Sequence, residues 1–407
     1  MLKSYSWIDN HDLAIRGTKS RFNKIYKISN FLNIERFCLG IGGFYPTRIK
    51  RTPLIKLSTL FVYFITFGQM WVVTNFVVST TDLSEISEVF LFSMTQVGFV
   101  SKLMNFLWRI KQVPLLDQML EQEIFTRVTT EEMTIWKGTF KRVQRYLVIF
   151  LSLCAGVVVL YGVIPAIENT KSDRKHYPFP GRFPFDPDRY YYVIYIGEVV
   201  AVAVSAFMNG SGLDCLFTKH TVIATVMFKI LCGKIEGLLD NVDKGERSAV
   251  EKRIRHCIVY YNEAVNYVSL VDRIFSYGIL VQFLCSAVVI CLTGFQMMLV
   301  MSFQSVKLGL MAIYFTCMMC QLILYCWHGH MLMEQSRGIT QACYSVDWNN
   351  MTIKEQKMLI LIMERAKKPI TIKAAGVFHL NLATLMAILR SSYSYFAVLR
   401  QLYNKTK

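Results

Sequence analysis

The stretch Tyr146–Ile167 reads YLVIFLSLCAGVVVLYGVIPAI and contains no charged residue. As an α-helix, its 22 residues are about 33 Å long, which is enough to cross the roughly 30 Å hydrocarbon core of a bilayer. A helix satisfies its own backbone hydrogen bonds, as any segment surrounded by lipid must. The stretch therefore predicts a membrane-spanning helix.

Six further apolar stretches have a similar length. The 407-residue chain is 53% hydrophobic and only 18% charged, against about 25% charged residues in soluble domains. This composition excludes a disordered chain, a collagen-like fibre and a small disulfide scaffold, and a soluble domain could hardly bury seven such stretches. We therefore expect an all-α polytopic membrane protein. The other six predicted spans are Leu54–Val78, Ile86–Trp108, Tyr190–Leu213, Ile274–Leu299, Leu308–Met333 and Val377–Leu402.

The distribution of Lys and Arg orients these spans. Loops on the side of the N-terminus contain 33 of these residues, and loops on the other side contain 8. Because positively charged loops stay in the cytoplasm, we expect a cytoplasmic N-terminus and an extracellular C-terminus. The net charge of +17 is then mainly an orientation signal rather than a nucleic-acid-binding surface. G-protein-coupled receptors also have seven spans, but in the opposite orientation.

The loops divide the chain into regions with different expected roles. The outer loops are short except Glu168–Arg189, whose prolines predict an ordered lid. The long inner loops are rich in helix formers and predict helices that continue the spans into a cytoplasmic block. The expected regions are a cytoplasmic segment at 1–53, spans 1 to 4 at 54–213, a cytoplasmic helical extension at 214–273, spans 5 and 6 at 274–333, an inner loop with an anchor helix at 334–376, helix 7 at 377–402 and an extracellular tail at 403–407.

Motifs for catalysis or metal binding are missing from the sequence. It has no phosphate-binding loop with Lys, no G-x-S-x-G and no H-E-x-x-H, so we expect no enzyme, no cofactor and no metal ion. None of the eleven cysteines falls in a predicted outer loop, and Cys317 and Cys320 are interpreted as small buried side chains. Lys102, near the inner end of span 2, is expected to extend its amine to the aqueous interface.

Characteristic short motifs occur from span 6 to the C-terminus. They are Tyr325-Cys326-Trp327, Glu334-Gln335-Ser336, Tyr344 with Asp347-Trp348, Arg365-Ala-Lys-Lys-Pro369 and Ser391-Ser-Tyr-Ser-Tyr-Phe-Ala-Val-Leu-Arg-Gln401. In these motifs the chain resembles the insect odorant receptor family, and within it the odour-specific subunit rather than the shared co-receptor. One departure is His328-Gly-His330, where the family usually has another residue after the Trp.

The resemblance implies a ligand-gated, non-selective cation channel. It further implies a small volatile odorant as ligand, a tetrameric assembly with the co-receptor, and a place in the dendritic plasma membrane of olfactory sensory neurons. The odorant would bind in the outer half of each subunit, and the last helix would line the pore. Two alternatives remain open: a gustatory-type receptor of the same superfamily, which the Ser-Tyr-Ser-Tyr-Phe ending disfavours, and a metabotropic seven-span receptor that conducts no ions itself.

One face of helix 7 changes from polar to apolar towards its outer end. Steps of three and four residues join Asn381, Thr384, Ile388, Ser391, Tyr395, Val398 and Leu402. A pore helix needs such a gradient, because polar groups line a wet vestibule and apolar ones form a gate; a Ser/Thr stripe used only for helix packing would look similar. The resemblance makes Val398 and Leu402 gate residues and Gln401 a pore-lining residue. The predicted pore and gate residues are Ser391, Tyr395, Val398, Gln401 and Leu402.

The outer halves of spans 2, 3, 4 and 6 contain aromatic and Met side chains with a few polar groups. Such side chains suit a small, largely apolar ligand, although each one alone is more often a packing residue. Glu198 stands out, because a carboxylate inside a span is by default a functional candidate. The predicted ligand-binding residues are Phe90, Met94, Val158, Tyr161, Tyr195, Glu198, Phe315 and Met319.

Overall fold

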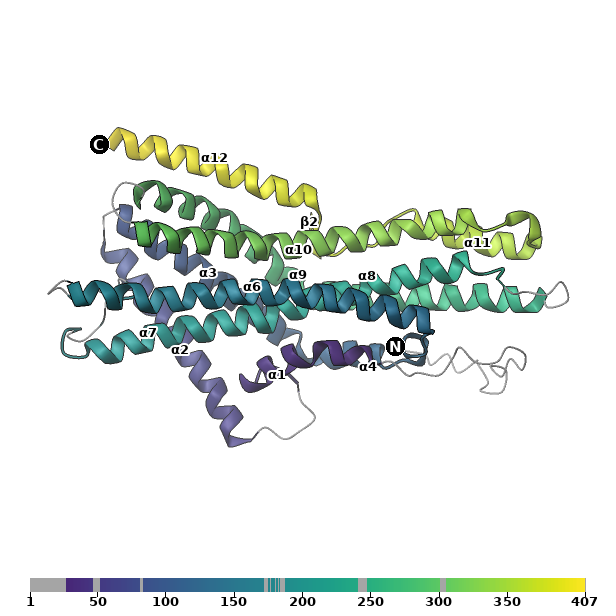
Figure 1. Ribbon diagram of the computed structural model, residues 1–407, viewed down its shortest axis with the longest axis horizontal. Helices are drawn as coiled ribbons and strands as arrows, with labels where there is room; N and C mark the ends of the chain where they lie inside the picture. The colour runs from purple at the N-terminus through teal and green to yellow at the C-terminus, as the bar shows by residue number, and fades with distance from the viewer. Residues whose placement is uncertain are drawn as a thin grey trace.

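The computed structural model shows an elongated helical bundle (Figure 1). It describes residues 27–46, 52–80, 83–171, 187–240, 247–300 and 305–406, together with Lys175, Tyr177–Phe179, Gly181 and Phe183. Half of the expected N-terminal segment (residues 1–26), much of the expected lid and the last residue of the expected tail therefore lie outside the described residues.

Within the described residues, seven helical stretches are long and apolar enough to cross a membrane, and each overlaps one of the seven predicted spans. The fourth stretch consists of α7, a π-helical segment η3 and α8 in direct succession. The seven stretches are α2 (Pro53–Ser79), α3 (Leu83–Trp108), α6 (Thr130–Lys171), α7 (Tyr191–Ala206) with η3 (Phe207–Asp214) and α8 (Cys215–Glu236), α9 (Arg247–Val300), α10 (Ser305–Ser345) and α12 (Leu382–Thr406).

Three of these helices are much longer than a membrane is thick. The helices α6, α9 and α10 contain 42, 54 and 41 residues, which corresponds to about 60 to 80 Å each, or at least twice the hydrocarbon core. Figure 1 shows that they run along the long axis, and that α8 and α11 (Ile353–Ala366) lie at the end opposite to the C-terminus. The spans therefore continue into a helical block beyond the membrane.

Short elements complete the described chain. The helix α1 is fixed to the block by two ion pairs, Glu35–Lys219 at 2.7 Å and Arg36–Asp117. Burial raises the pKa of the Asp117 carboxyl, and the Arg36 guanidinium opposes this effect. The short helices are η1 (Ile28–Leu32), α1 (Asn33–Ile41), η2 (Ile110–Gln112), α4 (Val113–Leu120), α5 (Glu123–Thr126) and η4 (Trp348–Asn350).

The last helix begins later than the sequence pattern predicts. A helix from Val377 is wrong, because two-residue strands β1 (Lys373–Ala374) and β2 (Phe378–His379) form an antiparallel hairpin there. Gly376 occupies the left-handed region with φ +74°, which favours a tight turn over a helix. The helix α12 then starts at Leu382, where the Asn381 side chain accepts a hydrogen bond of 2.8 Å from the Thr384 amide.

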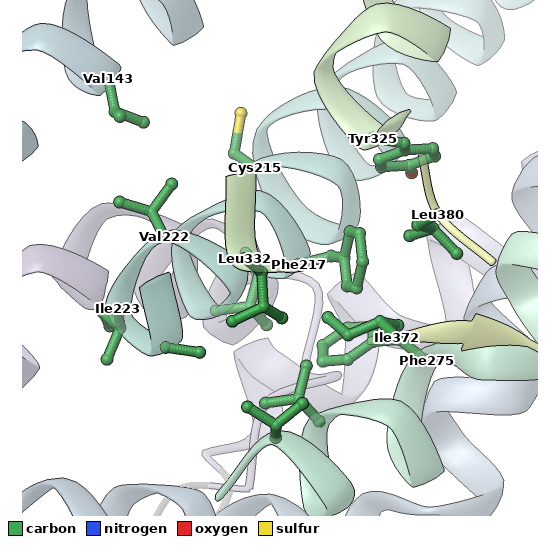
Figure 2. Packing of buried hydrophobic residues seen from close by; sticks show 14 of the residues in the cluster. Val143, Cys215, Phe217, Val222, Ile223, Phe275, Tyr325, Leu332, Ile372 and Leu380 are labelled. Carbon is green, nitrogen blue, oxygen red and sulfur yellow. The ribbon is translucent and has the colours of Figure 1, made fainter. Parts of the chain in front are cut away.

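The hairpin is fastened to the core at the base of α12. The Ser276 hydroxyl of α9 donates to the Lys373 carbonyl at 2.6 Å and accepts from the Ala375 amide at 2.7 Å. On the other side, Leu380 lies so close to Gly329 of α10 that a Cβ there would meet the Leu380 carbonyl oxygen at 2.5 Å. Figure 2 shows the apolar cluster that these contacts adjoin, with the labelled residues Phe217, Phe275, Tyr325, Leu332, Ile372 and Leu380.

Candidate ligand pocket and pore helix

Four aromatic rings from different elements form one cluster, which we call the aromatic box: Phe92 of α3, Tyr161 of α6, Tyr314 of α10 and Phe179 of the loop between α6 and α7. Phe92 meets Tyr161 and Phe179 edge-on, with ring centroids 4.5 and 4.3 Å apart. Phe179 is stacked on Tyr161 at 4.9 Å, and Tyr314 lies tilted against Phe92 at 5.5 Å. Such pairs contribute beyond the burial of their area and fix the relative orientation of the rings.

Two polar groups face this apolar cluster. The Glu198 carboxylate of α7, itself 9% exposed, accepts a hydrogen bond of 3.2 Å from the backbone amide of Phe179. The Tyr161 hydroxyl is buried and has no hydrogen-bond partner among the described residues. A buried polar group without a partner is costly, so the hydroxyl marks a position where a ligand group would be stabilised.

The structure brings two of the predicted ligand-binding residues together, since Tyr161 and Glu198 both contact Phe179. Tyr195 donates its hydroxyl to the Gly162 carbonyl of α6 and so links α7 to α6. Val158 is half-buried on α6. The remaining four predicted residues are partly buried and pack against the core; they are Phe90, Met94, Phe315 and Met319. Their binding role stays a prediction.

Sequence reasoning missed three members of the box. Phe92 lies between the predicted Phe90 and Met94, and Tyr314 precedes the predicted Phe315, so the prediction named the same helices but not the positions that form the box. An aromatic residue one or two positions away points elsewhere, because each residue turns an α-helix by about 100°. Phe179 had one signal in the sequence, its position between two prolines of the expected lid.

The predicted pore residues lie on α12, at the edge of the bundle (Figure 1). Tyr395, Val398 and Leu402 are 57, 55 and 54% exposed in the single chain, Gln401 is exposed and Ser391 is half-buried. The opposite face of α12 packs on α9, where the Tyr403 ring meets Phe295 edge-on at 5.7 Å. The C-terminal part of α12 therefore presents an exposed face in the single chain.

The N-terminal part of the predicted face is less exposed. Ile388 is 9% exposed, and the Ser391 hydroxyl donates to the Ala387 carbonyl at 2.6 Å within the same helix. Arg390 is exposed, as expected for a charge that faces water or another subunit. The helix face that joins Asn381 to Leu402 thus runs from the interior of the subunit to its surface. Its role as a pore lining stays a prediction.

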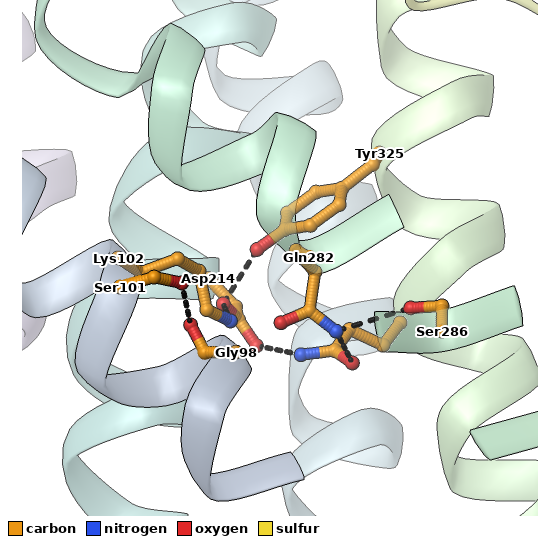
Figure 3. Close-up of polar contacts among 8 residues, drawn as sticks. Gly98, Ser101, Lys102, Asp214, Gln282, Ser286 and Tyr325 are labelled. Atoms are coloured by element: carbon orange, nitrogen blue, oxygen red, sulfur yellow. Dashed lines mark hydrogen bonds and ion pairs between the residues drawn. The ribbon is translucent and has the colours of Figure 1, made fainter. Parts of the chain in front are cut away.

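A buried polar network lies between α3, η3, α9 and α10 (Figure 3). The Lys102 ammonium pairs with the Asp214 carboxylate at 2.6 Å, and the side chains are 6 and 2% exposed. The Tyr325 hydroxyl donates to the same carboxylate at 2.5 Å, and the Gln321 amide donates to its other oxygen. The expectation that Lys102 extends to the interface is wrong, because a carboxylate within hydrogen-bond distance neutralises the charge inside the bundle.

The network continues through Gln282 and adjoins a small cavity. The Gln282 amide donates to the Gln321 carbonyl and to the Ser286 hydroxyl, both at 3.1 Å. The cavity, lined by Lys102 and Tyr325 among others, has a volume of about 10 Å³, which is close to the space that one water molecule needs. Among the residues that the structure covers, no group of three or more His, Cys, Asp or Glu side chains is placed to hold a metal ion.

The π-helical segment η3 places Asp214 in this network. A π-helical turn contains more residues than an α-helical turn, so it rotates the side chains that follow. The Ser211 hydroxyl bonds back to the Phe207 carbonyl at 2.5 Å, and a Cβ at Gly212 would meet Leu39 of α1 at 2.7 Å. Asp214 is the last residue of η3 and leads directly into α8, whereas the sequence pattern, because of its charge, put it at the start of an inner loop.

The bundle, the aromatic box and the exposed face of α12 define a seven-helix membrane protein with a candidate ligand site. The sequence profile of the family described as 7tm Odorant receptor matches residues 82–393, and the chain belongs to this family. A relative, putative odorant receptor 92a of Drosophila melanogaster, is 25% identical over 396 residues, which cover 93% of this chain and 88% of that protein. Odorant receptor 46a, isoform A, of the same species is 22% identical, with 91% and 97% covered.

Other similarities are shorter or purely structural. Against putative odorant receptor 85d of Drosophila melanogaster the chain is 27% identical over 214 residues and spans only half of that protein. The solved insect olfactory receptor OR5 from Machilis hrabei superposes with a TM-score of 0.80 at 16% identity, covering 92% of this chain and 98% of that one. The structure of the same receptor in complex with eugenol superposes with a TM-score of 0.78 at 16% sequence identity, and the alignment covers 92% of this chain and 100% of that one. At this identity the superposition establishes the common fold.

Proposed function

We propose that this chain is the odour-binding subunit of an odorant-gated, non-selective cation channel. The observation that carries the proposal is the aromatic box, where the Glu198 carboxylate and a buried Tyr161 hydroxyl without a partner among the described residues adjoin apolar rings. The chain also belongs to a family of odorant receptors. A small, largely apolar volatile suits such a surface. The complex of the structurally similar OR5 with eugenol supports a small organic ligand.

The channel part of the proposal rests on α12. Its exposed outer residues Tyr395, Val398 and Leu402 would meet the same helix of neighbouring subunits around a central pore, with Ser391 and Gln401 at polar levels. We propose that the neighbours include the odorant co-receptor in a tetramer, in the dendritic plasma membrane of olfactory neurons with the N-terminus inside. Binding and gating then need no catalytic group.

The experiment that tests this proposal records currents from cells that express the chain with the co-receptor, against a broad panel of volatiles. We expect a volatile-evoked cation current that is absent with the co-receptor alone and that persists when intracellular G-protein signalling is blocked. A response that vanishes with that block would favour a metabotropic receptor instead. An N-terminal tag accessible on intact cells would also contradict the proposal.

Gate variants test the role of α12 separately. Val398→Ser or Leu402→Ser should raise the resting leak or change ion preference, because a hydrophilic side chain lets water wet an apolar constriction. Val306→Ser on α10 is the matched control, since Val306 is similarly exposed at 63% but lies outside α12. If leak, conductance and ion preference are unchanged in both α12 variants, α12 does not form the gate.

A further inference from the structure

Phe179, in the loop between α6 and α7, enters the bundle. Phe179 is 3% exposed, although its neighbours along the chain belong to a connecting loop, and such loops normally lie on the surface. The adjacent Pro178 is also buried. The ring of Phe179 therefore occupies an interior position that the helices leave to it.

That position has the shape of a subsite for a six-membered ring. Phe92 and Tyr161 meet edge-on at 4.5 Å and form a corner, and the Phe179 ring fits into this corner, edge-on to one and stacked on the other. The two walls belong to α3 and α6, not to the loop. Aromatic faces and edges of this kind hold any flat ring of the same size.

The polar groups around Phe179 indicate what such a ring should carry. If Phe179 leaves, the Glu198 carboxylate loses the amide donor at 3.2 Å, and the Tyr161 hydroxyl already lacks a partner among the described residues. A ligand hydroxyl that replaces this amide can donate to the carboxylate, and the Tyr161 hydroxyl can donate to a second acceptor on the ligand. A hydrocarbon ring would leave both groups without a hydrogen-bond partner in an apolar site. Sites of this kind discriminate against a ligand that lacks the polar group.

We propose that Phe179 is an internal plug of the ligand pocket, and that the preferred ligand is a volatile with one six-membered ring and a hydroxyl group, which takes the place of the Phe179 side chain. This inference rests on the proposed function, because it names the ligand class of the same pocket. Phe179 then sets selectivity by competition: a ligand binds only if it satisfies the box better than the plug does.

The test uses benzyl alcohol and toluene as probes, because toluene has the shape of the Phe side chain and benzyl alcohol adds the hydroxyl. Thermal unfolding of the purified full-length chain is measured in lipid–detergent micelles with increasing amounts of each compound. In Phe179→Ala, benzyl alcohol should raise the unfolding midpoint with a half-maximal concentration at least tenfold lower than in the wild type, and at least tenfold lower than that of toluene.

Two further variants serve as a control and as a milder replacement. Phe228→Ala also removes a buried ring, one that packs on Tyr261 at a centroid distance of 6.2 Å, but in the block formed by α8 and α9. It should show no preference for benzyl alcohol, and an equal response in both alanine variants would overturn the proposal. If Phe179→Ala does not fold, Phe179→Leu should show the same order of affinities with a gain of about threefold, and no gain there would also overturn it.

A second measurement follows the plug in the wild-type chain. Hydrogen exchange at the Phe179 amide should accelerate at saturating benzyl alcohol, because the bond to Glu198 is broken when the plug leaves. Unchanged protection at saturation would contradict displacement. Current recordings separate the two proposals. If Phe179→Ala binds benzyl alcohol but no volatile evokes a current, only the channel proposal fails. If volatiles evoke currents but Phe179→Ala binds benzyl alcohol no better than the wild type, only the plug proposal fails.

Discussion

The polar network around Asp214 and the aromatic box around Phe92 lie in the same bundle but are held together in opposite ways. In the network, a buried ion pair is completed by donors from α10, so the charges of Lys102 and Asp214 are satisfied within the bundle. In the box, stacked and edge-on rings are closed by a loop residue, and the Tyr161 hydroxyl stays unpaired among the described residues. The comparison separates residues that hold the helices together from residues that a ligand can replace.

Removing the central carboxylate should have the largest effect. Asp214→Ala leaves the Lys102 ammonium buried and unpaired, and we expect a loss of about 3–5 kcal/mol in the free energy of unfolding. Denaturant unfolding of the purified chain in micelles measures it. The double variant Lys102→Met with Asp214→Leu should recover most of the loss, because it removes both charges together. Stability of Asp214→Ala near the wild type would mean that the network does not hold the bundle.

The same chemical change in the two clusters sharpens the comparison. Tyr325→Phe removes a hydrogen bond to the Asp214 carboxylate, which should cost about 1.5–3 kcal/mol. Tyr161→Phe removes a hydroxyl without a partner among the described residues, so its stability should stay within about 0.5 kcal/mol of the wild type. Parallel thermal unfolding of both variants measures the difference. Equal losses would show that the Tyr161 hydroxyl is satisfied after all.

A smaller effect is expected at the base of α12, where packing is as close as in the network. Gly329→Ala would place a Cβ at 2.5 Å from the Leu380 carbonyl, so the hairpin must shift, with an expected cost of about 1–3 kcal/mol. Gly309→Ala on the same helix α10 is the control, since its Cβ would meet no atom within 4 Å. The control should gain stability, because alanine favours a helix over glycine. Equal behaviour of the two variants in thermal unfolding would contradict the close packing.

The sequence predicted what depends on local composition. Seven uncharged or nearly uncharged stretches identified the seven spans, since an apolar helix of about 20 residues has the length and composition to be buried in a bilayer. The start of α12 was misplaced by five residues, because Val377 and Phe378 are apolar in a strand as well as in a helix. Helix phase could not be read from the sequence: Phe90 and Phe315 were predicted as ligand-binding residues, whereas Phe92 and Tyr314 form the box, and the binding role of all four stays a prediction.

Contacts between distant residues could not be predicted in this way. Lys102 and Asp214 are 112 positions apart, and the charge of Asp214 made it resemble the first residue of a loop. Only the π-helical turn before it brings the carboxylate to α3. Glu198 was recognised as unusual because a lone carboxylate in a span is visible in one sequence, whereas its partner, a backbone amide, leaves no signal there.

The helix α9 has a mechanical consequence. It runs without interruption from Arg247 to Val300, about 80 Å, and contacts α3 beside the box and α12 along its packed face. If it tilts as a stiff rod about one end, each degree displaces the other end by roughly 1.4 Å. A lever of this length turns a sub-ångström adjustment near its pivot into a displacement of more than an ångström at its far end.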